Sequence, residues 1–215
     1  LLQRESESRW NKRIARYLKD SQLPSTKTFA NLQWDRFSTR VRRQIANLRR
    51  GEFLDKTENI LAFGLPGRGK THLLCALCHE LTSQGRRVKY VTAVNLVQDL
   101  LRAKSELTLQ RLFKRMDRLE ALFIDDFGYV QYSREEMDVL FALLAHRYER
   151  RSVLLTSNLA FKEWGSIFKD ELTAMASIDR LVHHSEVLHL RGQSYRNQKK
   201  KAKAKAPSKQ VETQD

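Results

Sequence analysis

The sequence has little cysteine, little proline and no long apolar run. Its 215 residues include two Cys and three Pro, and no apolar stretch approaches the roughly 20 residues that span a bilayer. Charged residues follow directly on Leu1 and Leu2, so no secretory signal peptide is predicted. These absences argue against a membrane protein and a disulfide-stabilised secreted domain. We expect a cytoplasmic protein without a membrane partner.

The two cysteines, Cys75 and Cys78, have a C-x-x-C spacing. One such pair cannot complete a tetrahedral zinc site, and no second pair or histidine at ligand spacing accompanies it. We therefore expect both thiols to be buried in a helix as small apolar side chains, which suits a reducing compartment.

Acidic residues are scarce relative to basic ones. The chain holds 25 Asp and Glu against 40 Lys and Arg, a formal net charge of +15. A surplus of this size favours a polyanionic partner, most often nucleic acid. A solvated basic surface without any partner is the simpler alternative.

What the sequence does contain is a phosphate-binding loop pattern. An apolar stretch at 60–63 predicts a buried strand, and G-x-x-x-x-G-K-T and a helical pattern follow it. The glycines let backbone N–H groups converge on a phosphate, and the helix adds the positive end of its dipole. We expect Lys70 to reach the β- and γ-phosphates of ATP and Thr71 to hold Mg²⁺. The predicted nucleotide-binding residues are Gly64, Leu65, Pro66, Gly67, Arg68, Gly69, Lys70, Thr71 and His72.

Two further strands are predicted to end in polar side chains. Residues 121–125 form an apolar run that closes on Asp125 and Asp126, which is the Walker B pattern. Asp125 ends the strand and is the predicted second Mg²⁺ ligand, whereas Asp126 is placed to polarise the attacking water. A similar strand ends at Asn158, which suits either a γ-phosphate contact or the N-cap of a following helix.

Apolar strands alternate with helical patterns through residues 58–196. Strands are predicted at 60–63, 88–91, 121–125, 152–157 and 187–190, and helices at 70–84, 94–104, 107–116, 133–149, 161–168 and 171–184. The alternation predicts an α/β fold with a parallel sheet covered on both faces. In such sheets the ligand lies beyond the carboxyl ends of the strands, so the polar strand ends should meet in one crevice.

The two ends of the chain differ from this central domain. Residues 1–57 are strongly basic, with helical patterns at 4–18 and 36–50, and are interpreted as a basic N-terminal extension. Because the chain begins with Leu1 rather than Met, we expect this extension to belong to a truncated N-terminal domain. Residues 197–215 form a Lys-rich tail that is predicted to be disordered. Phosphate binding and a solubilising role remain equally open for that tail.

The helices after the second strand carry the predicted DNA contacts. The spacing within 109–118 separates an apolar face from a basic one. The candidates for contacts with DNA phosphates are Lys104, Arg111, Lys114 and Arg115, with Arg118 near the same face. A solvated helix face explains the same spacing without any ligand.

Together these stretches resemble the IstB-like ATPases, the helper ATPases of insertion-sequence transposition, close to the DnaC helicase loaders within the AAA+ superfamily. The matching stretches are GLPGRGKTHL at 64–73, ALFIDDFGY at 121–129, LFALLAHRYERRSVLLTSN at 140–158 and FKEWGSIFKDELTAMASIDRLVHHSEVLHLRGQSYR at 161–196. The resemblance implies an AAA+ P-loop fold of three α-β-α layers, with ATP bound between neighbouring subunits.

The resemblance also implies roles that the residues alone do not indicate. Asn158 corresponds to sensor 1, Arg180 to the arginine finger that reaches a neighbour's ATP, and Arg196 to sensor 2 in its own site. By chemistry alone neither arginine differs from the many others. The chain departs from the family pattern because many AAA+ proteins have Asp-Glu at Walker B. The shorter Asp126 predicts a looser water contact and slow hydrolysis.

The resulting prediction is an ATP-dependent helper that oligomerises on double-stranded DNA and assists an insertion-sequence transposase in target selection. A replicative helicase loader with the same core is the alternative. A DNA-binding module with a merely structural P-loop is a weaker hypothesis. A small-metabolite kinase leaves the charge of +15 unexplained.

Overall fold

Five parallel strands form one sheet in the order β2-β3-β4-β1-β5. The computed structural model describes residues 2–128, 131–159, 163–164, 178–192 and 194. The strands are β1 (Asn59–Phe63), β2 (Val88–Thr92), β3 (Ala121–Phe127), β4 (Ser152–Ser157) and β5 (Ser185–His189). Because β1 pairs with β4 and β4 with β3, the carboxyl ends of these three strands are neighbours in the middle of the sheet.

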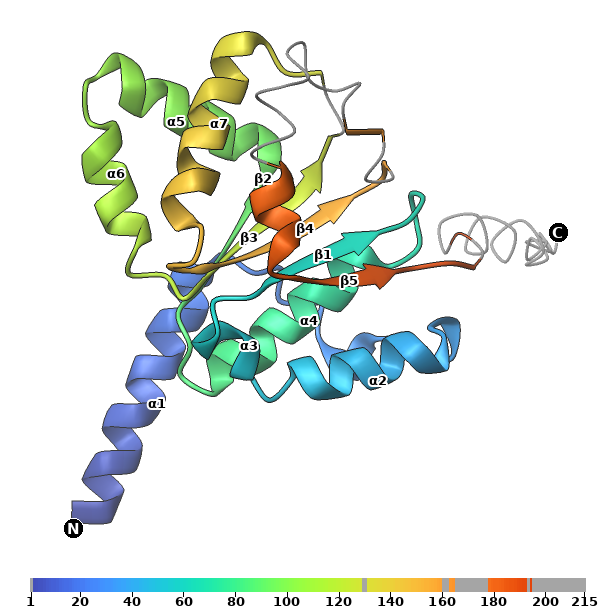
Figure 1. The fold of residues 1–215 in the computed structure, drawn as a ribbon. Helices are drawn as coiled ribbons and strands as arrows, with labels where there is room; N and C mark the ends of the chain where they lie inside the picture. The colour runs from blue at the N-terminus through green and yellow to red at the C-terminus, as the bar shows by residue number, and fades with distance from the viewer. Residues whose placement is uncertain (1, 129–130, 160–162, 165–177, 193, 195–215) are drawn as a thin grey trace, which may run out of the picture.

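Helices cover both faces of this sheet (Figure 1). On one face lie α2 (Thr39–Leu48), α3 (Glu52–Asp55) and α4 (Lys70–Ser83), and on the other α5 (Ala93–Ser105), α6 (Leu109–Met116) and α7 (Arg134–Arg147). Successive residues of β1 serve the two cores in turn, with Ile60 packing on the α4 side and Leu61 on the α5–α7 side. This is the predicted three-layer α-β-α fold.

The N-terminal segment packs onto the sheet domain. Helix α1 (Leu2–Ser21) contacts α4 and β2 and extends away from the body of the molecule (Figure 1). Two short 3₁₀ helices, η1 (Phe29–Asn31) and η2 (Trp34–Arg36), then lead into α2. Phe37, Val41 and Ile45 are buried in the same hydrophobic cluster as the apolar face of α4. The basic extension thus contributes part of the core.

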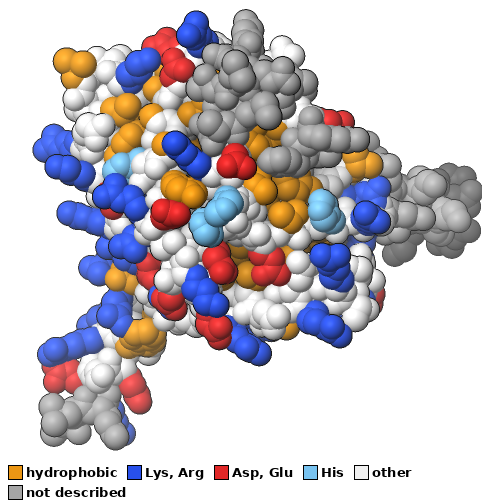
Figure 2. Space-filling view, viewed as in Figure 1, with side chains coloured by type: hydrophobic (Ala, Val, Ile, Leu, Met, Phe, Trp, Pro, Cys, Tyr) orange, Lys and Arg blue, Asp and Glu red, His pale blue; other side chains and the backbone are white. Residues whose placement is uncertain are grey.

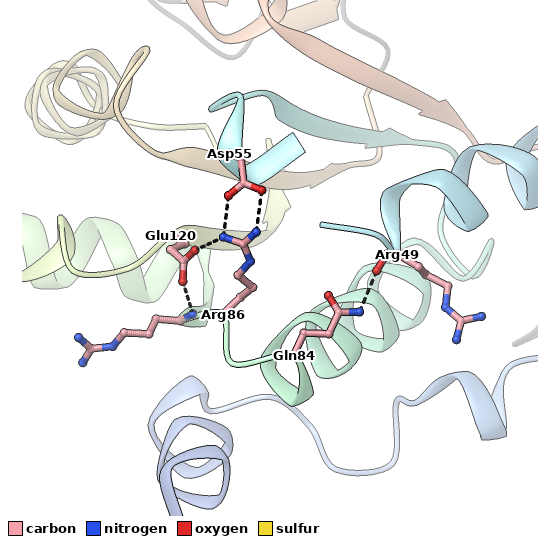
Figure 3. A network of polar contacts seen from close by, with 6 residues as sticks. Arg49, Asp55, Gln84, Arg86 and Glu120 are labelled. Atoms are coloured by element: carbon pink, nitrogen blue, oxygen red, sulfur yellow. Dashed lines mark hydrogen bonds and ion pairs between the residues drawn. The ribbon is translucent and has the colours of Figure 1, made fainter. Parts of the chain in front are cut away.

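A polar network fastens this segment to the start of the sheet (Figure 3). Arg86, in the loop between α4 and β2, donates both guanidinium ends to Asp55 at 2.7 Å and also contacts Glu120 at 2.8 Å. Gln84 donates from its amide to the backbone oxygen of Arg49 at 2.9 Å. These contacts join α2 and α3 to the loops that precede β2 and β3.

Several element boundaries differ from the predicted ones. Ser38 accepts a hydrogen bond from the backbone N–H of Val41 and caps α2, so the helix expected at 36–50 begins only at Thr39. The last strand begins two residues earlier than expected, at Ser185. The helix expected at 161–168 lies almost wholly outside the described residues, and within 171–184 residues 178–183 are helical.

Both cysteines lie in α4. Cys75 and Cys78 are free and fully buried, and burial raises the pKa of the Cys75 thiol to about 12. Within the described ranges, no helix combines the length and the apolar composition needed to cross a membrane.

Candidate nucleotide-binding site

The loop between β1 and α4 is shaped by glycine. Gly64 packs so closely against the chain after β5 that a Cβ there would lie 2.4 Å from the backbone oxygen of Leu190. Gly69 is the N-cap of α4 with φ +88°, a left-handed conformation that favours glycine. The loop can therefore turn directly into α4, whose first backbone N–H groups have no partner within the helix and face the turn.

Lys70 joins this loop to the end of β4. Its side chain is buried, with 5% exposed. Its Nζ donates to the backbone oxygens of Gly64 and Leu65, at 2.5 and 3.3 Å, and to Oδ1 of Asn158. The structure thus brings together the predicted lysine and asparagine. Both line one cavity of about 560 Å³ with Thr71, Asp125 and Asp126.

Asp125 is surrounded by three hydroxyl groups. Its Oδ1 accepts from Thr71 at 2.9 Å and from Thr156 at 2.5 Å, and its Oδ2 accepts from the Tyr90 hydroxyl at 3.0 Å. Burial and then the neighbouring Asp125 charge raise the pKa of Tyr90 well above its ordinary value. Sequence reasoning missed Tyr90 and Thr156, because an aromatic and a β-branched residue inside strands are typical of any sheet.

Asp126 has a backbone conformation unlike that of its neighbours. It lies in a bulge of β3, where the register with β4 shifts between Ile124 and Phe127, and its φ is +57°. Its backbone N–H donates to the Thr156 hydroxyl at 2.9 Å, and its side chain is exposed toward the cavity. Aspartate tolerates the left-handed region better than most residues. The shorter acid at Walker B therefore suits this backbone.

The N-terminal segment forms another wall of the same cavity. It contributes Lys27, Asn31, Leu32, Gln33, Arg36 and Phe37. Two histidines of α4 hold this segment in place: Nε2 of His72 contacts the backbone oxygen of Thr28 at 3.0 Å, and Nε2 of His79 that of Pro24 at 3.1 Å. Sequence reasoning missed this wall, because no local pattern in 27–37 indicates a ligand.

This set of groups fits a nucleoside triphosphate with Mg²⁺. The Thr71 hydroxyl and the Asp125 carboxylate supply hard oxygen ligands, the type that Mg²⁺ prefers, 2.9 Å apart. The Lys70 ammonium and the start of α4 supply positive charge for phosphates. The cavity is also of the size usual for small-ligand sites, which is about 300–1,000 Å³.

Comparison with known proteins agrees with this geometry. A family model described as IstB-like ATP binding protein matches residues 1–204. The chain belongs to the IstB-like ATP-binding family. A putative insertion sequence ATP-binding protein of Sinorhizobium fredii is 37% identical over 197 residues, which are 91% of this chain and 66% of that protein. The putative ATP-binding protein of insertion sequence IS21 from Pseudomonas aeruginosa is 36% identical over 203 residues, 93% of this chain and 76% of that protein. The chain thus spans only part of the length of these relatives, 66% of the first and 76% of the second.

Solved structures share this fold. The crystal structure of DnaI has a TM-score of 0.65 and 18% identity, covering 79% of this chain and 95% of that one. The replication initiator DnaA, bound to AMPPCP and single-stranded DNA, has a TM-score of 0.66 and 18% identity over 88% of this chain and 59% of that one. At such identities the likeness concerns the fold alone.

Of the two predicted arginines, Arg180 does not lie in the cavity of this IstB-like protein. Arg180 is exposed, and it lines a small depression together with Asn59 and Tyr148. Asn59 begins β1, so this depression lies at the opposite end of the strands from Lys70. Arg180 therefore does not reach the nucleotide site of its own subunit. Arg196 lies outside the described residues.

The basic residues of α5 and α6 gather in a separate concavity of about 540 Å³. Figure 2 shows lysine and arginine side chains along the edge of the molecule where α6 lies, continuing down to α1. The concavity is lined by the basic Arg102, Arg111, Lys114, Arg115 and Arg118 and by the acidic Asp99 and Glu106. Lys104 differs from the other predicted contacts, because its Nζ lies 3.2 Å from the Glu135 carboxylate.

Proposed function

We propose that this IstB-like protein is a Mg²⁺-dependent ATPase that oligomerises on double-stranded DNA and assists an insertion-sequence transposase in target selection. The observation that carries the proposal is the convergence of Lys70, Thr71, Asp125 and Asn158 on one cavity from three neighbouring strands. The names of the relatives, which are ATP-binding proteins of insertion sequences, support the same assignment.

In this proposal the described residues divide the work at the nucleotide. Lys70 would contact the β- and γ-phosphates, and Thr71 and Asp125 would hold Mg²⁺, which would neutralise the negative charge that develops on the phosphates. Asp126, on its bulge, orients the attacking water, and Asn158 senses the γ-phosphate through the Lys70 contact. Asp125 keeps its orientation because hydroxyls from β2 and β4 bind its carboxylate from two sides.

The DNA contacts of the proposal come from the concavity on α5 and α6. Five basic side chains there outnumber two acidic ones, so the surface attracts a phosphate backbone. Such contacts recognise the charge of the phosphates and not the base sequence, which suits a protein that accepts many target sequences. The DnaA neighbour is bound to single-stranded DNA, which is consistent with a nucleic-acid role for proteins of this fold.

The proposed self-assembly rests on Arg180, which is exposed and far from its own cavity. An arginine in that position suits the γ-phosphate of a neighbouring subunit, where its planar charge stabilises the transferred phosphoryl group. We assign Arg196 to the subunit's own site on the resemblance alone. The two free, buried thiols fit a cytoplasmic location.

The test is the particle size on duplex DNA with ATP, with ADP and without nucleotide, measured by sedimentation or light scattering. We expect a large complex with ATP only. Equal sizes in all three conditions would contradict the coupling of nucleotide to assembly. In the same assay Arg180→Ala should bind ATP normally but lose assembly and hydrolysis. Arg43→Ala, an exposed arginine of α2, is the matched control and should behave as the parent protein.

The helicase loader is the second candidate function, because the solved structure of the DnaC helicase loader has a similar fold, with a TM-score of 0.61 and 16% identity. The two functions differ in their protein partner. Co-purification with a transposase of the IS21 type supports the first, whereas recovery of a hexameric replicative helicase supports the second.

A further inference from the structure

One apolar side chain is almost completely exposed. Leu107, in the turn between α5 and α6, is 94% exposed, compared with 61% for Leu65 and 43% for Val94. Exposure of a single leucine is common at protein surfaces and needs no explanation by itself. Its backbone conformation is shared with Gln22, Thr57, Asp126 and Glu149, so Leu107 differs from these residues in its apolar side chain and its surroundings.

Leu107 occupies a position where glycine is the favoured residue. Its φ is +56°, its backbone N–H donates to Lys104 at 3.1 Å, and the next N–H, of Thr108, donates to Ala103 at 2.7 Å. This pair of hydrogen bonds is the Schellman motif, which ends helices with a left-handed residue, usually glycine. A leucine there is strained and buries nothing in this subunit. The chain therefore keeps an apolar side chain at a position where it costs stability.

The surroundings of Leu107 are those of a phosphate-binding surface. Its neighbours Glu106 and Thr108 line the concavity on α5 and α6, together with Arg111 one turn further along, whereas Leu107 itself lies beside the concavity and does not line it. Five basic side chains face that concavity against two acidic ones. A DNA backbone lying along α6 would therefore bring the base pairs beside the turn that carries Leu107.

We propose that Leu107 is an apolar wedge that enters between base pairs of the duplex held by α5 and α6. Proteins that kink DNA insert side chains such as leucine at a base step, unstack it and bend the helix by roughly 20–90°. This inference rests on the proposed function. It adds a residue that deforms the DNA, whereas the basic residues of the concavity only attract it.

A duplex suits this leucine better than a second copy of the chain. An identical surface would bring the basic concavities together, and like charges oppose that contact. A lone side chain among polar neighbours also gives too little apolar area for a protein interface, whereas a base step accepts one side chain. Because pyrimidine–purine steps unstack most easily, the wedge predicts a mild preference for TA and CA steps.

The test uses duplexes that carry 2-aminopurine, whose fluorescence rises on unstacking, at a central TA step. With ATP, the parent protein should raise the fluorescence, and Leu107→Ala should return it to the level of free DNA. The Kd for DNA should change by less than about threefold, because the phosphate contacts remain. Leu107→Gly should also lose the signal while raising the Tm by about 2–4 °C, since glycine relieves the strained backbone.

Gln22→Gly is the matched control, because Gln22 is exposed and uncharged and has the same φ of +56° at the end of α1. It should raise the Tm and leave the fluorescence signal intact. The wedge is ruled out if both Leu107 variants keep the parent signal, or if they change only the size of the oligomer. A parent protein that binds the duplex without unstacking it also overturns the wedge and leaves the proposed function standing. Failure to bind duplex DNA at all overturns both.

Discussion

The cavity at the strand ends and the concavity on α5 and α6 use charge in opposite ways. In the cavity, Lys70 and Asp125 are at least 95% buried. Lys70 donates hydrogen bonds to the loop after β1 and to Asn158 after β4, and Asp125 accepts them from β2, β4 and α4. In the concavity, Arg111, Lys114 and Arg115 stand on one short helix, where like charges are neighbours. The charges of the cavity are held in a fixed geometry, whereas those of the concavity together create a positive electrostatic potential over a wider surface.

This difference indicates what each site recognises. Buried charges are costly unless their partners are placed well, so the cavity suits one ligand of defined shape. Exposed like charges tolerate displacement and are screened by salt, so the concavity suits a repeating polyanion. Loss of a buried charge in the cavity should accordingly have a large effect, whereas loss of single charges in the concavity should have smaller, graded effects.

The largest effect is expected at the cavity, for Lys70→Ala. Removing the ammonium removes charge-assisted contacts to the phosphates, so ATP affinity should fall about 100-fold or more. Titration with a fluorescent ATP analogue measures this loss, and Lys56→Ala, an exposed lysine beside α3, is the control. Retained affinity in Lys70→Ala would show that the cavity does not bind the triphosphate.

The second effect separates binding from hydrolysis at Asp126. Asp126→Asn keeps a residue that tolerates φ +57°, so nucleotide affinity should be nearly unchanged. Turnover should fall about 100-fold, because the amide cannot polarise the attacking water. Asp126→Glu restores the acid of many AAA+ proteins but strains the bulge, and we expect it to hydrolyse no faster than the parent. A phosphate-release assay that shows faster turnover in the glutamate variant would contradict this account of the bulge.

The sequence was informative where a local pattern carries the structure. Short continuous apolar runs predicted the strands, and the glycine spacing predicted the loop that places Lys70. Contacts made only by folding were not predictable: Tyr90 and Thr156 look like ordinary strand residues, and the segment at 27–37 reaches the cavity through His72 and His79 of a distant helix. The bulge at Asp126 could not be predicted from the sequence either, because it depends on the register between β3 and β4.

A smaller, graded effect is expected in the concavity. Each phosphate contact contributes about 0.9 to the slope of log K against log salt, so Arg111→Ala with Lys114→Ala should lower that slope by about 2. Lys104→Ala should change it less, because Lys104 is already paired with Glu135 at 3.2 Å. Fluorescence anisotropy with a labelled duplex at several salt concentrations measures both. Equal slopes in all three proteins would remove α6 from the DNA interface.

The smallest effect tests whether the two kinds of site are as different as their contacts suggest. Tyr90→Phe removes one of three hydroxyls on Asp125 and leaves the ring packed edge-on against Phe123, with centroids 5.2 Å apart. Thr71 and Thr156 still orient the carboxylate, so stability should fall by only about 1 kcal/mol. The Mg²⁺ concentration needed for half-maximal turnover should rise a few-fold, since one carboxylate oxygen gains freedom. An unchanged Mg²⁺ requirement would mean that two hydroxyls suffice to fix Asp125, whereas complete loss of activity would mean that Tyr90 itself contacts the nucleotide.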